Sequence, residues 1–233
     1  LISLHIMHRV QKLLSNYGYC SRRRAEDLIK DGRVKVNGEV ISIGDQATEK
    51  DEICVDDELV YAEKKVYLIF NKPHGCVTAV FDDRYKTVME YIDVDERVFP
   101  VGRLDYNTTG LLIFTNDGDF ANNIMHPRYE IQKTYMVKVD KPVSRTHIVH
   151  LERGVELEDG QTSKAKVVSH EPNRIELTIH EGKNRIVRRM MGALGFDVLR
   201  LERIQIGGLK LGDLEVGTYK NLTEEDKKKI FEK

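Results

Sequence analysis

The sequence predicts an α+β fold, with a small basic N-terminal domain before a larger domain built on a mixed, largely antiparallel sheet. Strand-like segments outnumber helical ones, and hairpin-like neighbours dominate. Charge also divides the chain, since residues 9–35 hold eight Lys or Arg against three Asp or Glu, whereas residues 39–63 hold one Lys against nine acids. Such asymmetry can create a basic face on a chain whose net charge is −1.

Length and composition exclude several classes of protein. The 233 residues, 40% of them hydrophobic, allow a globular core and two unequal domains. No run of eighteen apolar residues exists, so we expect no membrane span. The three scattered cysteines fit reduced cytoplasmic thiols better than disulfides or a zinc site. Residues 1–6 are apolar but too short for a signal peptide, and Met7 is a candidate natural start.

The N-terminal region predicts two short helices and a hairpin. Apolar residues at helical spacing favour a helix over His8–Tyr17. Ser21 is a good N-cap for a second helix, and Gly32 is suited to end it. The segment Arg33–Val40 alternates and turns on Asn37-Gly38, which predicts a hairpin. With further strands through Val60, these elements make a domain over residues 7–60.

Arg22, Arg23 and Arg24 crowd the first turn of the second helix, where cations oppose the helix dipole. Stability therefore does not explain them, whereas binding to phosphate would. An ordinary solvated basic face is the alternative, and we favour the phosphate interpretation.

A polar linker at Tyr61–Lys65 leads into the larger domain, which is expected over residues 66–233. Strands are expected at Val66–Phe70, Cys76–Val80, Arg97–Val101, Gly110–Thr115, Gln132–Val139, Lys164–Ser169, Arg174–His180 and Val198–Ile206. Helices are expected at Thr87–Ile92, Asp117–Met125, Ser144–Arg153 and Asn184–Leu194, and from Glu224 onward.

One carboxylate, Asp105, lies in a tight turn between two of these strands, beside Arg103 and Tyr106. An acid at a strand end can serve as a nucleophile or a base. Taken alone, a turn Asp is more often a structural Asx-turn or cap residue.

Two further segments add candidates. Lys183, Arg185, Arg188 and Arg189 gather where a strand gives way to a helix, and their position implies an anionic partner, either RNA phosphate or Asp105. The alternative is a basic helix start on the surface. Tyr135 on a strand is most often a packing residue, but it can also be a platform on which a base stacks.

Two resemblances connect these segments. The stretch CSRRRAEDLIKDGRVKVNGEVI looks like the RNA-binding module named after the fourth protein of the small ribosomal subunit. The stretches VFPVGRLDYNTTGLLIFTNDGDFANNIMH, KTYMVKV and EGKNRIVRRM, in that order, resemble the pseudouridine synthases that isomerise uridine in ribosomal RNA. The branch typified by small-subunit synthase A and large-subunit synthase B fits best, and the tail favours the synthase B group.

The resemblance implies roles for individual residues. Asp105 matches the catalytic aspartate, Tyr135 the aromatic residue that stacks on uracil, and Arg188 the basic partner of the aspartate. We expect Asp105 and Arg188 to lie within salt-bridge reach, with Tyr135 facing the same cleft. Candidate substrate-binding residues are Ile179, Arg103, Lys183, Arg185 and Arg189, and candidate RNA-binding residues are Arg9, Lys12, Arg22, Arg23, Arg24 and Lys35.

Smaller correspondences and one departure remain. Lys72 and Pro73 match the family's first motif, which is structural, whereas Ile186 stands where the family usually has Gln. That departure puts one local polar contact in doubt.

The implied reaction exchanges an N–C glycosidic bond for a C–C bond without a net redox change, so we expect no cofactor and no metal. We expect ribosomal RNA of the large subunit as partner, no membrane, a monomer and a cytoplasmic location. The alternatives are small-subunit specificity and a noncatalytic RNA-binding factor for ribosome assembly.

Overall fold

The computed structural model describes residues 6–232, so the expectations for residues 1–5 lie outside it. Contacts divide the chain into two compact units. The first holds the chain through Val66 with segments 94–98 and 116–118, and the second holds segments 67–93 and 99–115 and the chain from Asp119 onward. The change of unit at Val66 directly follows the polar stretch Tyr61–Lys65, which forms neither helix nor strand.

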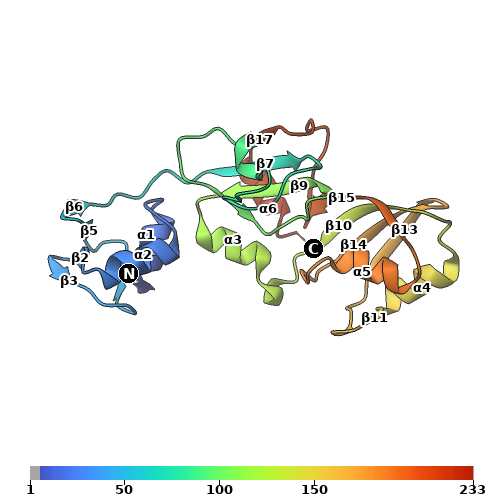
Figure 1. Ribbon diagram of the computed structural model, residues 1–233, viewed down its shortest axis with the longest axis horizontal. Helices are drawn as coiled ribbons and strands as arrows, with labels where there is room; N and C mark the ends of the chain where they lie inside the picture. The colour runs from blue at the N-terminus through green and yellow to red at the C-terminus, as the bar shows by residue number, and fades with distance from the viewer. Residues whose placement is uncertain (1–5, 233) are drawn as a thin grey trace. The chain divides into compact units, whose positions relative to one another are not determined.

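In its described part, which begins at Ile6, the N-terminal unit combines two helices with six short strands (Figure 1). Its elements are β1 (His8–Arg9), α1 (Val10–Asn16), α2 (Arg22–Lys30), β2 (Val34–Val36), β3 (Glu39–Val40), β4 (Gln46–Ala47), β5 (Ile53–Val55) and β6 (Glu58–Leu59). Strands β3, β2, β5 and β6 form an antiparallel sheet in that order, and β1 pairs with β4. Apolar residues of both helices, including Leu14 and Leu28, share one core with the strands.

The expected local signals of this unit are confirmed. The Ser21 hydroxyl accepts a hydrogen bond from the Arg24 N–H at 3.2 Å, as an N-cap should. Asn37 and Gly38 adopt φ values of +51° and +86°, which the two-residue hairpin turn requires. The first helix starts at Val10 rather than at His8, because His8 pairs with Ala47 in β1.

The second unit is built on one mixed sheet. Its strands are β7 (Tyr67–Lys72), β8 (Phe99–Val101), β9 (Thr108–Thr115), β10 (Lys133–Val139), β13 (Lys166–Glu171), β14 (Arg174–Ile179), β15 (Val198–Ile206), β16 (Leu209–Lys210) and β17 (Tyr219–Asn221). The order across the sheet is β13-β14-β10-β15-β9-β7-β17, with β8 on β9 and β16 on β15. A separate hairpin joins β11 (Glu156–Leu157) to β12 (Gly160–Gln161).

Strands β9 and β15 run parallel, whereas the other described pairings of the sheet are antiparallel. Gly110 on β9 pairs with Arg203 on β15 at this junction. Gly110 has φ +99°, and a Cβ there would lie 2.3 Å from the Arg203 carbonyl oxygen. Glycine is therefore what allows the two strands to meet.

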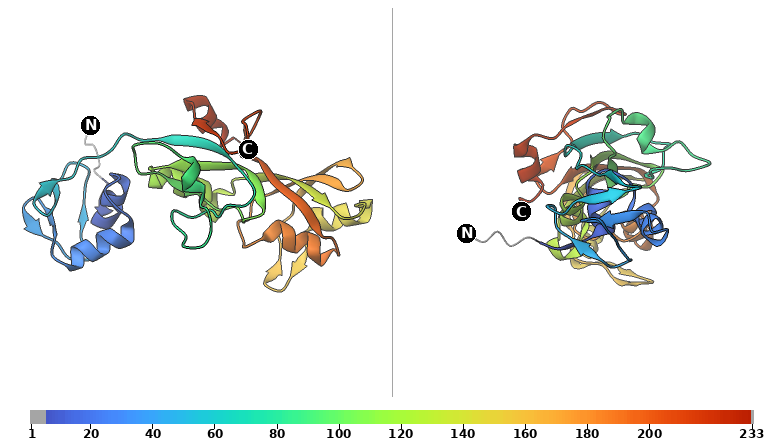
Figure 2. Two further views of the ribbon diagram at one scale, coloured as in Figure 1. Left: turned by 45° about the horizontal axis from the view of Figure 1, so that its top comes forward. Right: turned by 90° about the vertical axis from the view of Figure 1, so that its left-hand side faces the viewer.

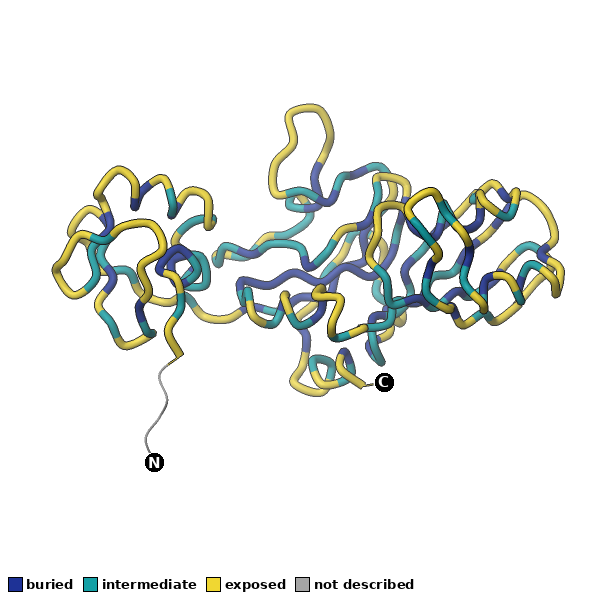
Figure 3. The backbone as a smooth tube through the Cα atoms, turned by 90° about the horizontal axis from the view of Figure 1, so that it is seen from below, coloured by how far each residue is buried: buried dark blue, intermediate teal, exposed yellow. Residues whose placement is uncertain are grey.

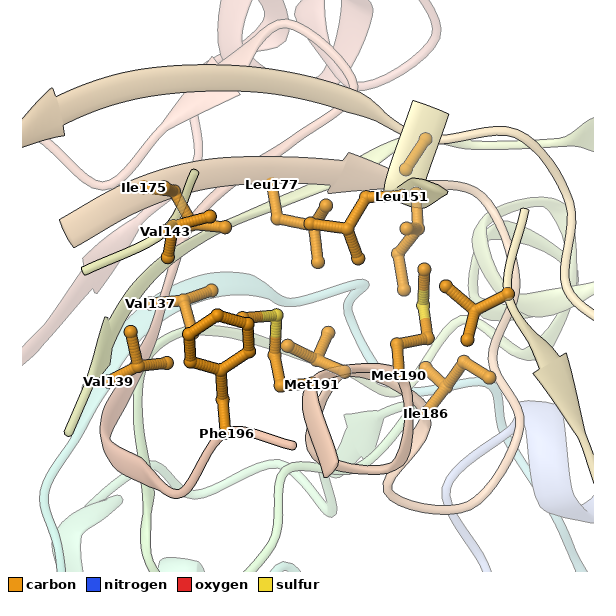
Figure 4. Packing of buried hydrophobic residues seen from close by; sticks show 14 of the residues in the cluster. Val137, Val139, Val143, Leu151, Ile175, Leu177, Ile186, Met190, Met191 and Phe196 are labelled. Atoms are coloured by element: carbon orange, nitrogen blue, oxygen red, sulfur yellow. The ribbon is translucent and has the colours of Figure 1, made fainter. Parts of the chain in front are cut away.

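Helical elements flank the sheet (Figure 2), and its strands β7 and β9 are buried along most of their length (Figure 3). The helical elements are η1 (Val88–Tyr91), α3 (Gly118–Met125), η2 (Pro127–Tyr129), α4 (Arg145–Arg153), α5 (Ile186–Ala193) and α6 (Glu224–Lys229). One core joins α4 and α5 to β10 and β14, with Leu151, Met190 and Leu177 among its buried members (Figure 4). The other joins β7, β9 and α3 and includes Ile69, Ile113 and Ile124.

The predicted α+β class and largely antiparallel sheet are confirmed, but one expected strand is wrong, and two expected helices differ in their start or their type. Cys76–Val80 is not a strand, because its backbone makes one isolated bridge, Val77 with Thr87. The helix expected from Asn184 begins at Ile186, because Arg185 adopts a left-handed φ of +48°. The segment expected to be helical near Thr87 is the 3₁₀ turn η1.

Candidate active site

The turn that carries Asp105 joins β8 to β9 and is fixed by its own backbone. The Thr108 N–H donates to the Asp105 carbonyl oxygen at 3.0 Å, and the Gly75 N–H donates to the Tyr106 carbonyl oxygen at 3.1 Å. Asp105 is partly exposed, whereas its neighbour Leu104 is buried. Backbone hydrogen bonds thus hold the turn in place, and the turn presents the Asp105 carboxylate.

Lys72, at the end of β7, holds the same turn from within the protein. Its side chain is fully buried, and its Nζ donates to the carbonyl oxygens of Pro73 at 3.0 Å and Thr108 at 3.0 Å, with Tyr106 at 3.5 Å. Burial lowers the pKa of Lys72, and the nearby Cys76 and Asp105 oppose this shift. Lys72 belongs to the segment that matches the family's first motif, which is structural. Its contacts agree with a structural role, because they hold backbone carbonyl oxygens of the turn.

Thr78 anchors the turn on the other side. Its hydroxyl donates to the Leu104 carbonyl oxygen at 2.7 Å and accepts from the Leu104 N–H at 3.1 Å. Both groups of Leu104, the residue directly before Asp105, are satisfied by this one side chain. The segment that failed to form a strand therefore serves as a support for the turn.

A cavity of about 570 Å³ opens in front of Asp105. Its walls include Tyr135 from β10 and Lys183 and Arg185 from the segment before α5. Arg103, from the Asp105 turn, also lines it. The volume lies in the range of small-molecule sites. The structure thus brings Asp105 and Tyr135 to one cleft, as the sequence led us to expect.

Arg188 does not form the expected ion pair with Asp105 among the described residues. Its guanidinium donates instead to the carbonyl oxygens of Val198 at 3.0 Å and Asn107 at 3.3 Å. Burial lowers the pKa of Arg188, the positive charge of Arg185 adds to this shift, and the charge of Asp105 opposes it. The charges of Arg188 and Asp105 thus interact, but the hydrogen bonds of Arg188 go to the backbone of the turn and not to the carboxylate.

Two more candidates lie outside the cavity wall. Ile179, 4% exposed, belongs to the core against which Tyr135 packs. Arg189 points to Asp159, with an Nη1 to Oδ2 distance of 3.1 Å. Neither side chain lines the cavity, so neither is placed to contact a ligand that fills it.

The basic candidates of the N-terminal unit are largely accessible. Arg9, Arg22, Arg23 and Arg24 are exposed, and the last three occupy the first turn of α2, which holds no acidic residue. Lys35 differs from them, because its Nζ lies 2.5 Å from an oxygen of Asp57. Lys12 is partly buried, and its Nζ lies 3.3 Å from the Nδ1 atom of His8.

Three charged residues that the sequence analysis did not single out also line the cavity, namely Lys133, Glu181 and Arg203. The signal for Lys133 was present, because it lies two residues before Tyr135 on the same strand and so on the same face. Glu181 carries a short hydrogen bond from the Ser163 N–H and an ion pair with Lys183 at 3.4 Å. Arg203 gave no local signal, since its position depends on a strand neighbour distant in sequence.

Neither a metal centre nor a membrane helix is found in the described part of the chain. Within residues 6–232, no group of three or more His, Cys, Asp or Glu side chains is arranged to hold a metal ion. No helix in that range is long and apolar enough to cross a membrane.

Comparison with known proteins matches both parts of the chain. Residues 66–193 match the family model described as RNA pseudouridylate synthase, and residues 8–53 match the model described as S4 domain. Ribosomal large subunit pseudouridine synthase B of Bacillus subtilis (strain 168) is 44% identical over 96% of this chain and 96% of its own length.

A second relative and a solved structure agree with this match. The dual-specificity RNA pseudouridine synthase RluF of Escherichia coli (strain K12) is 35% identical, covering 96% of this chain and 78% of its own length. A crystal structure of a pseudouridylate synthase, 34% identical, superposes with a TM-score of 0.72 and covers 95% of this chain and 99% of that chain.

Proposed function

The chain belongs to the RNA pseudouridylate synthase family, and we propose that it isomerises a specific uridine in the ribosomal RNA of the large subunit. The relative from Bacillus subtilis, named for the large ribosomal subunit, supports this choice of RNA. In this proposal residues 7–60 bind RNA and residues 66–233 carry out the reaction. The protein acts as a monomer in the cytoplasm.

The observation that carries the proposal is the shared cavity of Asp105 and Tyr135. Isomerisation needs a uridine drawn out of its stack, at a cost of a few kcal/mol. A flipped base entering this cavity meets the ring of Tyr135 as a stacking face and the carboxylate of Asp105 as its reactive neighbour. The cavity is large enough to let the detached base turn before its new bond forms.

The other residues assist these two. Arg188 holds the Asn107 end of the turn and adds positive charge near Asp105. Arg103, Lys183 and Arg185 offer cations to the RNA backbone at the cavity rim. Ile179 supports the strand behind Tyr135 from the core.

The remaining basic residues belong to the same proposal. Arg189 pairs with Asp159, and the part of its side chain that remains accessible binds RNA. On the N-terminal unit, Arg22, Arg23 and Arg24 contact RNA phosphates, and Arg9, Lys12 and Lys35 extend that basic set.

The test is a pseudouridine map of ribosomal RNA from cells that carry the wild-type protein, no protein, or the Asp105→Asn variant. We expect one large-subunit position to be modified with the wild type and unmodified in the other two strains. Modification restored by Asp105→Asn would contradict the role of Asp105. If the strain without the protein instead lacks a pseudouridine in small-subunit RNA, the choice of RNA is wrong. If its map is unchanged and the protein still binds RNA, the protein is a noncatalytic assembly factor.

A further inference from the structure

A β-bulge determines what faces Tyr135 across the sheet. On β10 and β15, Lys133 pairs with Ile206 and Thr134 with Gln205, but Tyr135 pairs with Arg203. The register shift between Thr134 and Tyr135 skips Ile204 on β15. Without the bulge, an isoleucine would stand opposite Tyr135. The irregularity therefore places a guanidinium beside the proposed stacking face, which is a known use of bulges near sites.

Arg203 is buried but incompletely bonded. Its side chain is 4% exposed, and its Nε donates to the Leu111 carbonyl oxygen at 2.8 Å. Its Nη2 is buried and has no hydrogen-bond partner in residues 6–232. A buried donor left unpaired destabilises the folded protein. Because Arg203 lines the cavity, a ligand there can supply the missing acceptor.

Lys133 is the second cation on this wall. It lies on the same face of β10 as Tyr135, and its Nζ is 3.5 Å from the His180 carbonyl oxygen. Burial lowers the pKa of Lys133 to about 8, and the positive charge of Arg203 adds to the shift. Lys133 and Arg203 repel each other because both carry positive charge inside the cavity. An anionic ligand between them would relieve this repulsion.

We propose that Lys133 and Arg203 form a site for the negative charge that the uracil base carries while it is detached from the ribose. The inference rests on the proposed function and assigns two further catalytic residues to it. Their cationic groups contact the base, whereas Asp105 lies on the sugar side of the same cavity.

The electron balance of the reaction explains why such a site is useful. When the bond between N1 and C1′ breaks, its electron pair stays with uracil, and resonance places the charge on O2 and O4. The electron-deficient C1′ lies beside the Asp105 carboxylate. The pair returns to C1′ when C5 bonds to it, C5 then releases its proton, and N1 takes one up. Fixed cations at the carbonyl oxygens stabilise the charge that develops during the first step.

The experiment measures the release of tritium from C5 during one turnover. The full chain is mixed in excess with an unmodified large-subunit ribosomal RNA transcript that carries 5-tritiated uridine. The variants Arg203→Gln and Lys133→Met are compared with the wild type for rate and for RNA affinity at several salt concentrations. Arg200→Gln on β15 and Lys138→Met on β10 serve as matched controls, because both residues are exposed and lie outside the cavity wall.

We expect both test variants to release tritium about a hundredfold more slowly, as for loss of a transition-state donor. Their RNA affinity and its salt dependence should match the wild type, and both controls should keep the wild-type rate. Arg203→Lys, which retains a cation, should recover part of the rate. A melting temperature for each variant identifies loss of folding, and Lys133→Met tests the site without removing the bond from Arg203 to Leu111.

Three other results would each contradict a different part of the proposal. If the wild type releases tritium and both test variants do so at the same rate, the proposed anion site is wrong. If the variants instead weaken RNA binding and flatten its salt dependence at an unchanged rate, the two cations bind an RNA phosphate. If the wild type itself releases no tritium from the large-subunit transcript, the proposed function fails and not this inference alone.

Discussion

The Arg188 guanidinium donates a hydrogen bond to the carbonyl oxygen of Asn107 at 3.3 Å, two residues beyond Asp105. Another hydrogen bond, to the Val198 carbonyl oxygen at 3.0 Å, ties the same side chain to the start of β15. Arg188 therefore bridges α5, β15 and the Asp105 turn. Its positive charge interacts with the Asp105 carboxylate, and its hydrogen bonds help to fix the position of the turn.

Arg188→Lys should slow the reaction because one ammonium group cannot reproduce the two-directional fork of a guanidinium. Loss of one charge-assisted hydrogen bond is worth about 1.5–3 kcal/mol, or roughly a ten- to hundredfold decrease in single-turnover rate. Tritium release from C5 measures this rate. Arg153→Lys, on the exposed face of α4, is the control and should have no effect. A wild-type rate for Arg188→Lys would contradict the bridging role.

Thr78→Val should destabilise the protein and slow the reaction together. Valine keeps the shape of threonine but leaves the Leu104 N–H and carbonyl without the partners that the hydroxyl supplies. The expected cost is about 1–3 kcal/mol for each buried group left unpaired. Urea unfolding measures it. Thr78→Ser restores the hydroxyl and should recover most of the loss, whereas equal stability of all three proteins would show that the two hydrogen bonds contribute nothing.

Gly110→Ala should destabilise the protein severely. The new Cβ would meet the Arg203 carbonyl oxygen at 2.3 Å and would occupy a backbone conformation of φ +99° that alanine rarely adopts. We expect a loss of at least about 3 kcal/mol in the free energy of unfolding. Gly192→Ala within α5 is the matched control, because its Cβ meets no neighbour, and it should stabilise the helix by about 1 kcal/mol. Similar stabilities of the two variants would refute the close approach of β9 and β15.

Lys133 gives the stability a dependence on pH with a definite sign. Its pKa falls from 10.5 to about 8 on folding, so the unfolded chain binds more protons between these values and stability rises with pH across that window. The full effect amounts to roughly 3 kcal/mol. Lys133→Met should therefore be more stable than the wild type near pH 7, and the difference should shrink as the pH approaches 10.5.

Other charged groups also border the cavity that Lys133 lines. From the neighbouring elements these are Arg203, Glu181, Lys183, Arg185, Asp105 and Arg103. They are shared by wild type and variant, so the difference between the two unfolding curves isolates Lys133. Chemical denaturation at pH 7, 9 and 10.5 provides the comparison. A difference that does not change with pH would show that the lysine is not perturbed.

Charge reversal at Arg22, Arg23 and Arg24 should weaken RNA binding and reduce its dependence on salt. All three side chains are exposed in the first turn of α2. Removing one cation from an RNA phosphate should lower the slope of log affinity against log salt by about one. Reversal at Glu39, an exposed acid on β3, is the control for net charge. Unchanged affinity and slope would show that this face does not contact RNA.

Much of the fold was predictable because its signals are local. Ser21 as an N-cap, Asn37-Gly38 as a hairpin turn, and the strand Val198–Ile206 depend on residues close in sequence, and each is confirmed. The strand expected at Cys76–Val80 is wrong because its bonding partners, Leu104 among them, are far away along the chain. Local apolar pattern alone does not reveal that a segment is occupied in holding a turn.

The family was predictable from the sequence, because its ordered motifs are local, and the comparisons bear out that family. The arrangement of charges around the cavity became known from the three-dimensional contacts. Arg188 binds the backbone of the turn instead of the acid, and Arg203 faces Tyr135 through a bulge. The physical reason is that motif residues reflect chemistry required at one point, whereas hydrogen-bond partners and strand register are settled by packing between segments remote in sequence.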